Sequence, residues 1–467
     1  MGLNLLSICR RGLHTSPARL QVIQGVAPTK RICIVGAGPA GFYAAQLLLK
    51  QLSDCVVDVV EKLPVPFGLV RFGVAPDHPE VKNVINTFTK TAEHPRLRYF
   101  GNVSLGTDVS LKELRERYHA VLLTYGADQD RELELENEQQ GNVISARKFV
   151  AWYNGLPGAE NLNPDLNGRD VTIVGQGNVA VDVARMLLSP LDALRVTDTT
   201  EYALEALSRS QVERVHLVGR RGPLQAAFTI KELREMLKLP NVDTRWRTDD
   251  FSGVDSLVEK LQRPRKRLTE LMLKSLKEQG RASGAAGSKQ FLPIFLRAPK
   301  AINLGEMEFS VTKLQEDYAV ATDNTERLPS DLILRSIGYK SSCVDSDINF
   351  DTRRGRVHNT EGRVLKDTEK IDPGLYVAGW LGTGPTGVIL TTMSGAFAVA
   401  KSICDDIAAN VLDTSCAKPG YDAADKRVVT WDGWKRIDQF ESEAGKAKGK
   451  PREKIVSIQE MLKVAGV

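Results

Sequence analysis

The hydrophobic pattern first becomes regular at residue 31, where a short apolar run leads into a glycine-rich turn. Residues 31–35 (RICIV) are apolar after their first position without polar alternation, which is typical of a buried strand. The turn at residues 36–41 has the spacing GxGxxG, and residues 42–50 continue with a helical pattern. A second apolar run, residues 56–60, ends in Glu61. This order predicts a β-α-β unit at the start of the fold.

Each glycine of this first turn has a structural role in a dinucleotide site. Gly36 permits the tight turn, Gly38 lets the backbone approach a pyrophosphate, and Gly41 lets the helix pack on the strand. The helix N-terminus offers unpaired N–H groups to the phosphates. Glu61 follows Gly41 by 20 residues and is placed to accept hydrogen bonds from a ribose 2′-hydroxyl. A purely structural glycine turn is the alternative, and the complete strand, helix and acid series argues against it.

The same pattern returns in the middle of the chain. Residues 171–174 (VTIV) predict a strand, residues 175–180 have the spacing GxGxxA, and residues 181–188 continue as a helix. The second strand, residues 215–218, arrives late because the polar and acidic segment 192–213 intervenes. The repeat predicts a second dinucleotide site in the same chain.

Arginines follow the second site where the first site has a carboxylate. Arg220 and Arg221 come directly after the strand and Gly219. A 2′-phosphate carries nearly two negative charges, which guanidinium groups bind and a carboxylate repels. The pair therefore predicts NADP(H) rather than NAD(H), although a solvated turn is the weaker alternative. Two such sites in one enzyme indicate hydride transfer from a nicotinamide to a flavin, so we expect FAD at the first site.

A third glycine-rich segment lies near the C-terminus. Residues 374–380 predict a strand and a turn, and residues 384–389 lead into a helix that continues to about residue 407. We expect this segment to complete the FAD domain after an inserted NADP domain. The predicted fold class is α/β, with two dinucleotide-binding Rossmann-like domains and the NADP domain inserted into a discontinuous FAD domain. The predicted boundaries are 29–128 and 336–467 for the FAD domain and 129–335 for the NADP domain.

Composition and charge exclude several classes of protein. The 467 residues have a formal net charge of +5, which is too small for a dedicated nucleic-acid-binding protein. No apolar run approaches the roughly 18 residues that a spanning helix needs. The six cysteines include no CxxC pair and the six histidines no metal-binding spacing, so we expect no metal or iron–sulfur site. A flavin without a CxxC pair must pass its electrons to a one-electron acceptor rather than to a disulfide.

The first residues have the composition of a targeting sequence rather than of a folded segment. The first acidic residue is Asp54, whereas Arg10, Arg11 and Arg19 stand among apolar and hydroxyl side chains. This composition predicts a mitochondrial transit peptide over residues 1–24 and places the mature protein in the mitochondrial matrix. A floppy basic N-terminus is the alternative, and a secretory signal fits less well because its apolar stretch is short. Removing the three arginines from the net charge of +5 leaves +2.

Several further motifs are similar to those of the adrenodoxin-type ferredoxin–NADP reductases. The longest is the proline-punctuated run PVPFGLVRFGVAPDHP at residues 64–79, and the resemblance extends from about residue 30 to the end of the chain. It implies non-covalent FAD, NADPH as hydride donor, and a [2Fe–2S] ferredoxin that supplies mitochondrial cytochrome P450, as in steroid metabolism, or iron–sulfur assembly. The other matching motifs are residues 174–180, 218–223, 263–267, 384–389 and 450–454.

The fingerprints and the resemblance together give the candidate cofactor contacts. The predicted FAD contacts are Gly36, Gly38, Ala40, Gly41, Glu61, Leu69, Leu105, Trp380, Gly387, Val388 and Ile389. The predicted NADP contacts are Gly175, Gln176, Gly177, Asn178, Val179, Arg220, Arg221, Glu232 and Gly387.

Two residues are candidates for a catalytic role. The resemblance places His78 and Asp182 close to the redox centre as a proton or electrostatic relay. A loop-fixing hydrogen bond is the alternative role for His78, and an early-helix carboxylate favoured by the helix dipole is the alternative for Asp182.

A basic segment offers a docking surface for the partner. Residues 260–289 hold nine basic and two acidic residues, and residues 263–278 have a helical pattern. A solvated face is the usual interpretation of such a run, but an acidic ferredoxin gives the charges a function in encounter and orientation. No aromatic residues interleave with these charges, which argues against nucleic acid. The predicted partner-binding residues are Arg263, Arg265, Lys266 and Arg267.

Two rival functions remain open at this point. An electron-bifurcating or glutamate-synthase-type subunit would share the two folds but would bring cysteine clusters, which this sequence lacks. An NADPH-sensing flavoprotein that acts through partner binding would show no ferredoxin-dependent turnover. Membrane association would be peripheral at most, at the inner mitochondrial membrane.

Overall fold

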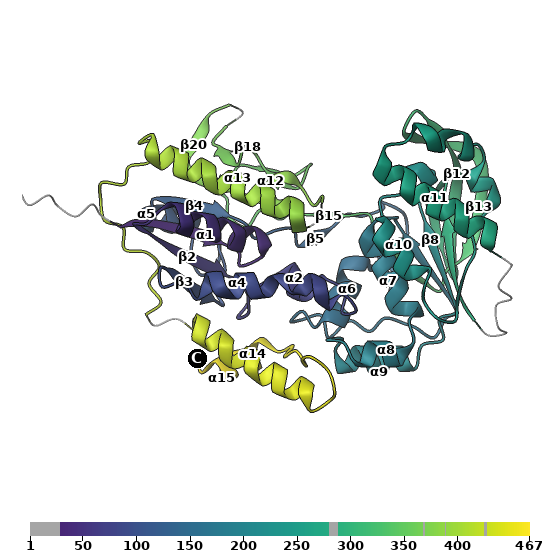
Figure 1. Cartoon of the computed structure of the whole chain (residues 1–467), viewed down its shortest axis with the longest axis horizontal. Helices are drawn as coiled ribbons and strands as arrows, with labels where there is room; N and C mark the ends of the chain where they lie inside the picture. Colours follow the sequence, from purple (N-terminus) through teal and green to yellow (C-terminus); the bar gives the residue numbers. More distant parts are fainter. Residues whose placement is uncertain (1–28, 280–287, 368, 388, 425–426) are drawn as a thin grey trace, which may run out of the picture.

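Two sheets with parallel strands at their centres, each in its own lobe, form the framework of the chain (Figure 1). The computed structural model describes residues 29–279, 288–367, 369–387, 389–424 and 427–467. The predicted transit peptide (residues 1–24), Arg281 and Val388 lie outside these residues. No helix within the described ranges is both long enough and apolar enough to cross a membrane.

The first lobe is built on a seven-stranded sheet with the order β18-β19-β20-β4-β1-β2-β3. Its centre is parallel, and the late strand β20 joins β4 in parallel before β19 and β18 extend the sheet in antiparallel fashion. A strand from the end of the chain therefore completes the N-terminal sheet. The strands are β1 (Lys30–Val35), β2 (Cys55–Glu61), β3 (Leu97–Gly101), β4 (Ala120–Leu123), β18 (Asn359–Thr360), β19 (Arg363–Leu365) and β20 (Ile371–Val377).

Alternate residues of β1 face two different cores, because side chains alternate across a strand. Ile32 and Ile34 pack towards helices α1 (Pro39–Gln51), α4 (Val84–Ala92) and α13 (Ile389–Ala408). Cys33 and Val35 lie in the second core with residues of α5 (Leu111–Arg117). The strand is buried on both faces, as its unbroken apolar run predicts.

The second lobe is built on a six-stranded sheet with the order β6-β14-β7-β8-β10-β9, and all its described pairings are parallel. Its sequence lies between the two parts of the first lobe, which confirms the predicted insertion. The strands are β6 (Val143–Ser145), β7 (Asp170–Val174), β8 (Arg214–Val218), β9 (Val242–Thr244), β10 (Lys289–Ile294) and β14 (Leu332–Arg335). Its main helices are α6 (Ala146–Asn154), α7 (Asn178–Leu188), α10 (Ile230–Met236) and α11 (Arg263–Glu278).

Two features of the second lobe differ from expectation. The segment 192–213 is not merely polar, because α8 (Leu191–Arg195) and α9 (Glu201–Ser208) bury Leu194 and Leu204 against the lobe. A three-stranded antiparallel sheet, which the sequence analysis did not predict, covers the other face of the parallel sheet. Its strands are β11 (Arg297–Asn303), β12 (Glu306–Gln315) and β13 (Tyr318–Pro329).

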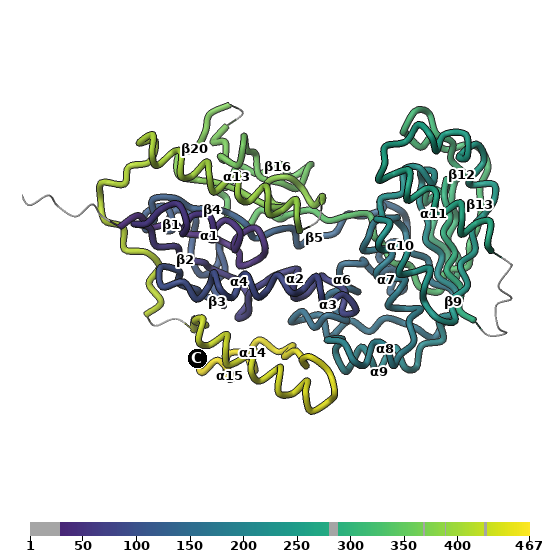
Figure 2. Tube along the Cα trace, in the orientation of Figure 1, coloured from purple at the N-terminus to yellow at the C-terminus, as the bar shows by residue number. Residues whose placement is uncertain are grey.

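The chain passes between the lobes along a short antiparallel pair. The strand β5 (Gln129–Asp130) leaves the first lobe, and β15 (Tyr339–Lys340) returns to it, with Tyr339 opposite Asp130. These strands lie close to the predicted boundaries at residues 129 and 336, which remain predictions. We call this pair the β5/β15 crossing; Figure 2 shows the trace of the chain through it.

The two C-terminal helices pack against the first lobe. Helices α14 (Trp431–Lys446) and α15 (Ile458–Ala465) bury Trp434, Ile437 and Met461 in the same core as α1. The residues that connect them, 447–457, reach towards the second lobe at the edge opposite the β5/β15 crossing (Figure 1).

Candidate active site

The first fingerprint turn has the geometry of a pyrophosphate cradle. Gly36 has a φ of +112°, and a Cβ there would lie 2.7 Å from the carbonyl of Thr124. A Cβ at Gly41 would lie 2.2 Å from the oxygen of Gly36. In contrast, a Cβ at Gly38 would meet nothing within 4 Å. Packing therefore explains Gly36 and Gly41, whereas the open space at Gly38 fits a bound phosphate group.

Glu61 lies at the end of β2 beside this turn. Its carboxylate accepts hydrogen bonds from the backbone N–H of Ala37 at 2.8 Å and of Leu63 at 3.1 Å. Burial raises the pKa of Glu61, and these N–H groups oppose that shift. The carboxylate is thus fixed at the carboxyl end of β2, where a ribose hydroxyl is expected. Leu105 lies behind it, buried in the core with Val60.

The proline-punctuated run folds over the first turn. Phe67 donates its N–H to the carbonyl of Ala37 at 2.8 Å, and a Cβ at Gly68 would lie 3.3 Å from the Cα of Gly38. Phe67 has a φ of +82°, which is unusual for a non-glycine residue and marks stored strain. Its ring is buried among other aromatic rings. Leu69 begins α2 (Leu69–Phe72) and stays 39% exposed, so this predicted FAD contact remains accessible to a ligand.

The third glycine-rich segment meets the first turn from the other side. Gly379 has a φ of +67°, and a Cβ there would lie 2.8 Å from the Cβ of Ala40. Trp380 begins α12 (Trp380–Thr383), and its ring centroid is 5.8 Å from that of Tyr339. The turn that precedes the predicted FAD contact Trp380 therefore packs against the predicted FAD contact Ala40. Gly387 has a φ of +85°, and Ile389 is the first described residue of α13.

The second fingerprint turn repeats the geometry of the first. Gly175 has a φ of +126°, and a Cβ there would lie 2.1 Å from the oxygen of Ser336. A Cβ at Gly177 would meet nothing within 4 Å, as at Gly38. Val179 lies half-buried in the first turn of α7, directly after this opening. The second turn therefore also fits a phosphate group approaching a helix N-terminus.

Two other predicted NADP contacts already bind the protein itself. The Gln176 amide donates to the carbonyl of Ile294 at 2.9 Å and of Leu217 at 3.3 Å, so it ties the ends of two strands together. The Asn178 side chain accepts the N–H of Thr229 at 2.8 Å. These bonds give both residues a role in shaping the turn, and their contact with NADP remains a prediction.

Three arginines gather after β8. Arg220 and Arg221 are exposed, and neither side chain has a hydrogen bond or ion pair with another described residue. Arg265 reaches them from α11 and donates to the carbonyl of Ala226. Burial lowers the pKa of Arg265, and the positive charge of Arg221 lowers it further. Like charges held together without a carboxylate between them form a site for an anion.

A charged cluster joins the two lobes at the expected redox centre. His78 Nε2 is 2.6 Å from Glu235 Oε2, which pairs a residue of the first lobe with one of the second. Arg185 of α7 donates to Asp77 from Nε at 2.5 Å and to Asp182 from Nη2 at 2.9 Å. Two residues from different lobes thus bind the same guanidinium. We call this group the junction cluster; its members are Asp77, His78, Asp182, Arg185, Glu232 and Glu235.

Three separately predicted residues come together in the junction cluster. One candidate metal-ligand atom from each of His78, Asp182 and Glu232 lies within 4.8 Å of the others. The Arg185 guanidinium also contacts Glu232, at 3.1 Å, so the carboxylates already have a cation partner. Burial raises the pKa of Asp182 to about 8, and its hydrogen bond with Glu232 adds to the shift. The Arg185 guanidinium opposes this shift.

Three members of the junction cluster are not among the site residues predicted from the sequence. Asp77 precedes His78 in the proline-punctuated run, Arg185 follows Asp182 by three residues on α7, and Glu235 follows Glu232 by three on α10. The spacing i, i+3 places such pairs on one helix face, which is a signal that could have found Arg185 and Glu235. The pairing between lobes has no signal in the sequence.

The basic residues of segment 260–289 differ from one another in exposure and in ion pairing. Arg263 and Arg267 are exposed on α11, without a recorded side-chain partner in the described part of the chain. Lys266 is paired with Glu259 at 2.7 Å, and Lys277 lies 3.8 Å from Asp255. Lys289 belongs to β10 and donates to the carbonyl of Leu187, so it does not belong with the basic residues exposed on α11. Arg265 faces Ala226 instead of the exposed side.

Comparison with known proteins adds independent findings. Residues 34–101 match the NAD(P)-binding Rossmann-like domain family. A Drosophila melanogaster protein named mitochondrial NADPH:adrenodoxin oxidoreductase is 86% identical over all of both chains. A Homo sapiens protein of the same name is 48% identical over 94% of this chain and 92% of its own. The solved structure of Mycobacterium tuberculosis FprA in complex with NADPH has a TM-score of 0.87 and 36% identity, covering 94% of this chain and 100% of that chain.

The fold and the site define a flavoprotein reductase that uses FAD and NADP(H), with one dinucleotide turn in each lobe. Identity over the whole length then narrows this class. The chain belongs to the family of mitochondrial NADPH:adrenodoxin oxidoreductases, and it is an oxidoreductase of the ferredoxin–NADP reductase type.

Proposed function

We propose that this chain oxidises NADPH at the second-lobe turn and passes the electrons through FAD at the first-lobe turn to an adrenodoxin-type [2Fe–2S] ferredoxin. The single observation that carries the proposal is the pairing of two open phosphate cradles, at Gly38 and Gly177, with a charged cluster that joins their lobes. FAD supplies the conversion between a two-electron donor and a one-electron acceptor. Downstream delivery to a mitochondrial cytochrome P450 or to iron–sulfur assembly belongs to the ferredoxin.

The chain's own residues position FAD in this proposal. Gly38 and the N-terminus of α1 face the pyrophosphate, while Glu61 accepts a ribose hydroxyl in addition to its backbone bonds. Ala40 packs against the turn at Gly379 that precedes Trp380, and we expect the N-terminus of α13 to face this site. The remaining FAD contacts are those of the sequence analysis, including Val388 outside the described residues.

The arginine group selects NADP(H) in this proposal. Arg220 and Arg221 are free to bind the 2′-phosphate, and we add Arg265 as a third guanidinium. Gly177 and the first turn of α7 receive the pyrophosphate. A dinucleotide without the 2′-phosphate would leave three arginines without a counter-charge, so NADH should be a poor donor.

The junction cluster controls charge and protons beside the reacting atoms. His78 is oriented by Glu235, while the raised pKa of Asp182 favours a protonated carboxyl beside Arg185. Hydride transfer moves negative charge between the lobes, and a cluster that can accept or release a proton there limits the cost of that movement. His78 and Asp182 are the proposed relay residues.

An acidic ferredoxin is the proposed partner at the exposed face of α11. Arg263 and Arg267 project from that face, one helical turn apart, and support complementary docking. Asp255 and Glu259 lie beside this face, so the docking surface is smaller than the run of basic residues. We place the protein in the mitochondrial matrix, at most peripherally associated with the inner membrane.

A reconstituted assay tests the proposal. The FAD-loaded protein is mixed with NADPH or NADH, an adrenodoxin-type ferredoxin and cytochrome c. We expect cytochrome c reduction that requires ferredoxin and strongly prefers NADPH. Tight NADPH binding without ferredoxin-dependent turnover would favour an NADPH-sensing flavoprotein instead.

A further inference from the structure

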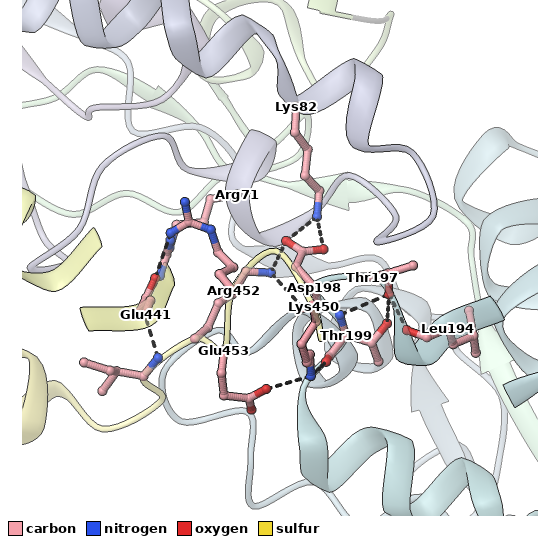
Figure 3. Close-up of polar contacts among 12 residues, drawn as sticks. Arg71, Lys82, Leu194, Thr197, Asp198, Thr199, Glu441, Lys450, Arg452 and Glu453 are labelled. Carbon is pink, nitrogen blue, oxygen red and sulfur yellow. Dashed lines mark hydrogen bonds and ion pairs between the residues drawn. The ribbon is translucent and has the colours of Figure 1, made fainter. Parts of the chain in front are cut away.

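A segment with no role in the proposed function ties the two lobes together. We call residues 447–457, between α14 and α15, the C-terminal strap. Lys450 Nζ contacts the backbone oxygen of Thr199 (Figure 3), and it also contacts Glu201 Oε1 at 2.8 Å; both residues belong to the second lobe. Lys454 Nζ contacts Asp198 Oδ2 at 2.8 Å. The side chains of Lys450 and Lys454 are 1% and 0% exposed, so these are buried contacts.

The strap is anchored on the first lobe by a buried carboxylate. Glu441 of α14 accepts hydrogen bonds from Arg71 Nη2 at 2.5 Å and from Arg452 Nη1 at 3.0 Å (Figure 3). It also accepts the backbone N–H of Ile455 at 2.9 Å. The side chains of Glu441 and Arg71 are 0% and 3% exposed. The strap therefore moves with the first lobe and reaches across to the second.

Asp198 is the point at which three parts of the chain meet. It lies between α8 and α9 of the second lobe and also contacts Lys82 Nζ, with oxygen distances of 2.7 and 2.8 Å. Lys82 ends α3 (Pro79–Lys82) of the first lobe, in direct continuation of the proline-punctuated run. Burial opposes the charge of Asp198, but Lys454 and Lys82 hold its pKa well below the usual range. The carboxylate is thus bound by the first lobe directly and through the strap.

The arrangement leaves the lobes connected at two opposite edges (Figure 1). The β5/β15 crossing joins them covalently at one edge, and Asp198 joins them through ions at the other. Between them lie the junction cluster and the pair Glu80–Lys231 at 2.8 Å. A rotation about the crossing would draw Asp198 away from Lys82 and leave buried charges unpaired, which is costly.

We propose that Asp198 is a positioning residue for hydride transfer, holding the lobes at a fixed angle through Lys82 and Lys454. The inference deepens the proposed function and rests on it, because the lobes carry the two dinucleotide sites. Displacements of about 1 Å between reacting atoms can slow a reaction by orders of magnitude. Asp198 touches neither site and acts only through the angle between the lobes.

Two variants test the proposal in the FAD-loaded protein. Asp198→Asn removes the carboxylate's charge from both lysines. Lys454→Met removes only the strap's contact with Asp198, which stays paired with Lys82, so it guards against failure of the first variant to fold. Asp192→Asn is the matched control, since that carboxylate lies on α8 and its side chain is 99% exposed.

The first readout is the distance between the lobes, measured by pulsed electron spin resonance. Spin labels are attached at Lys90→Cys on α4 and Lys274→Cys on α11, with the exposed Cys343 and Cys416 replaced by serine. The second readout is the single-turnover rate of FAD reduction by saturating NADPH. The third is the dissociation constant of 2′,5′-ADP, which reports the second site alone.

We expect both variants to broaden or shift the distance distribution and to slow FAD reduction at least fivefold, with 2′,5′-ADP affinity within twofold of wild type. The Asp192→Asn control should match wild type in all three. An unchanged distance distribution, or a changed distribution with an unchanged reduction rate, would overturn the positioning role. Failure of wild type itself to pass electrons from NADPH to ferredoxin would instead refute the proposed function.

Discussion

At the residue scale, Arg185 determines how much negative charge the junction cluster can hold. Its guanidinium contacts Asp77, Asp182 and Glu232, and its own side chain is 2% exposed. One guanidinium faces three carboxylates there, of which Glu232 is buried and Asp77 and Asp182 are partly buried, and this crowding favours a proton on Asp182. Burial raises the pKa of Asp182 and Glu232 raises it further, against the effect of Arg185.

The retained proton makes stability depend on pH. Because the folded chain binds the proton of Asp182 more tightly than the unfolded chain, stability from this group is present at low pH. It is lost as pH rises from about 4 towards the folded pKa of about 8. Asp182→Asn removes this loss, so the Tm of the variant relative to wild type should rise by about 2–5 °C between pH 5.5 and pH 8.5.

The check is calorimetry of both FAD-loaded proteins at the two pH values, with Asp192→Asn as an exposed control. A difference in Tm that stays constant with pH would show that Asp182 is ionised throughout this range.

Arg265 gives a second prediction at this scale. Arg265→Gln should weaken binding of 2′,5′-ADP about 10-fold, the effect of losing one hydrogen bond to a charged group, and leave 5′-ADP binding unchanged. Titration calorimetry measures both constants. Lys274→Gln, which removes an exposed cation from the same helix, is the control. Equal weakening of both nucleotides in Arg265→Gln would assign the residue to the fold of the turn.

The sequence predicts individual site residues better than their partners. The resemblance to ferredoxin–NADP reductases points to His78, Asp182 and Glu232, and the structure brings one ligand atom of each within 4.8 Å of the others. Their partners Arg185 and Glu235 are ordinary surface-type residues on amphipathic helices, and only the packing of two lobes turns them inward. Arg265 was assigned to the partner surface because the sequence of a helix does not reveal which of its basic side chains face the protein. In the structure Arg265 faces Ala226.

At the scale of elements, the first glycine of each fingerprint turn serves folding and the second serves ligand binding. In each turn, the first glycine is required by the backbone, with φ of +112° at Gly36 and +126° at Gly175. The second glycine, Gly38 or Gly177, has an extended backbone that any residue can adopt, with N-cap φ of −83° and −92°. Only a ligand explains why no side chain stands there.

Gly177→Ala should therefore weaken NADP⁺ binding at least 10-fold while changing the Tm of the nucleotide-free protein by less than about 1 °C. Gly175→Ala, by contrast, should lower that Tm markedly, because its Cβ would lie 2.1 Å from the Ser336 oxygen. Titration with NADP⁺ and thermal unfolding give both numbers. Normal NADP⁺ affinity in Gly177→Ala would refute the phosphate site at this turn.

The elements of the two β-α-β units follow from the sequence because each is locally determined. The predicted strands at 31–35 and 215–218 agree with β1 and β8 to within one residue at each end. The helix predicted over 42–50 starts earlier, at Pro39, since proline suits the first helical turn. The sheet of β11, β12 and β13 was missed because many of its residues are polar and exposed on one face.

At the scale of the whole molecule, the position of the charged residues says more about function than the net charge does. The net charge of +5 becomes +2 once the three arginines of the predicted transit peptide are removed. Within the folded part, acids on neighbouring elements neutralise several of the basic residues of α11. Arg263 and Arg267 are exposed on α11 without an ion-pair partner among the described residues, which makes them the strongest candidates for docking an acidic ferredoxin.

Arg263→Glu with Arg267→Glu should raise the KM for ferredoxin about 10-fold at low salt and leave NADPH-dependent reduction of a small dye unchanged. The effect should shrink as salt is raised, because exposed charges are screened. Arg209→Glu, at an exposed position directly after α9, is the control. Equal loss of ferredoxin and dye reduction would indicate disturbed folding rather than lost docking.

The arrangement of the lobes is the least predictable feature. The motif at residues 450–454 was visible, but its partners lie about 250 positions earlier in the chain, at Asp198 and Glu201. Buried ion pairs of this kind depend on three segments meeting, which no local pattern encodes. The inserted order of the two folds was predictable because each fold carries its own fingerprint.

The most direct test of the account is an anaerobic single-turnover experiment with the FAD-loaded protein. One equivalent of NADPH is added and the flavin absorbance is followed; oxidised ferredoxin is then added and its reduction counted. We predict full bleaching of the flavin by NADPH, a rate with NADH at least 100-fold lower, and two ferredoxins reduced per NADPH. Bleaching by NADH at a similar rate, or reduced flavin that does not reduce ferredoxin, would contradict the account.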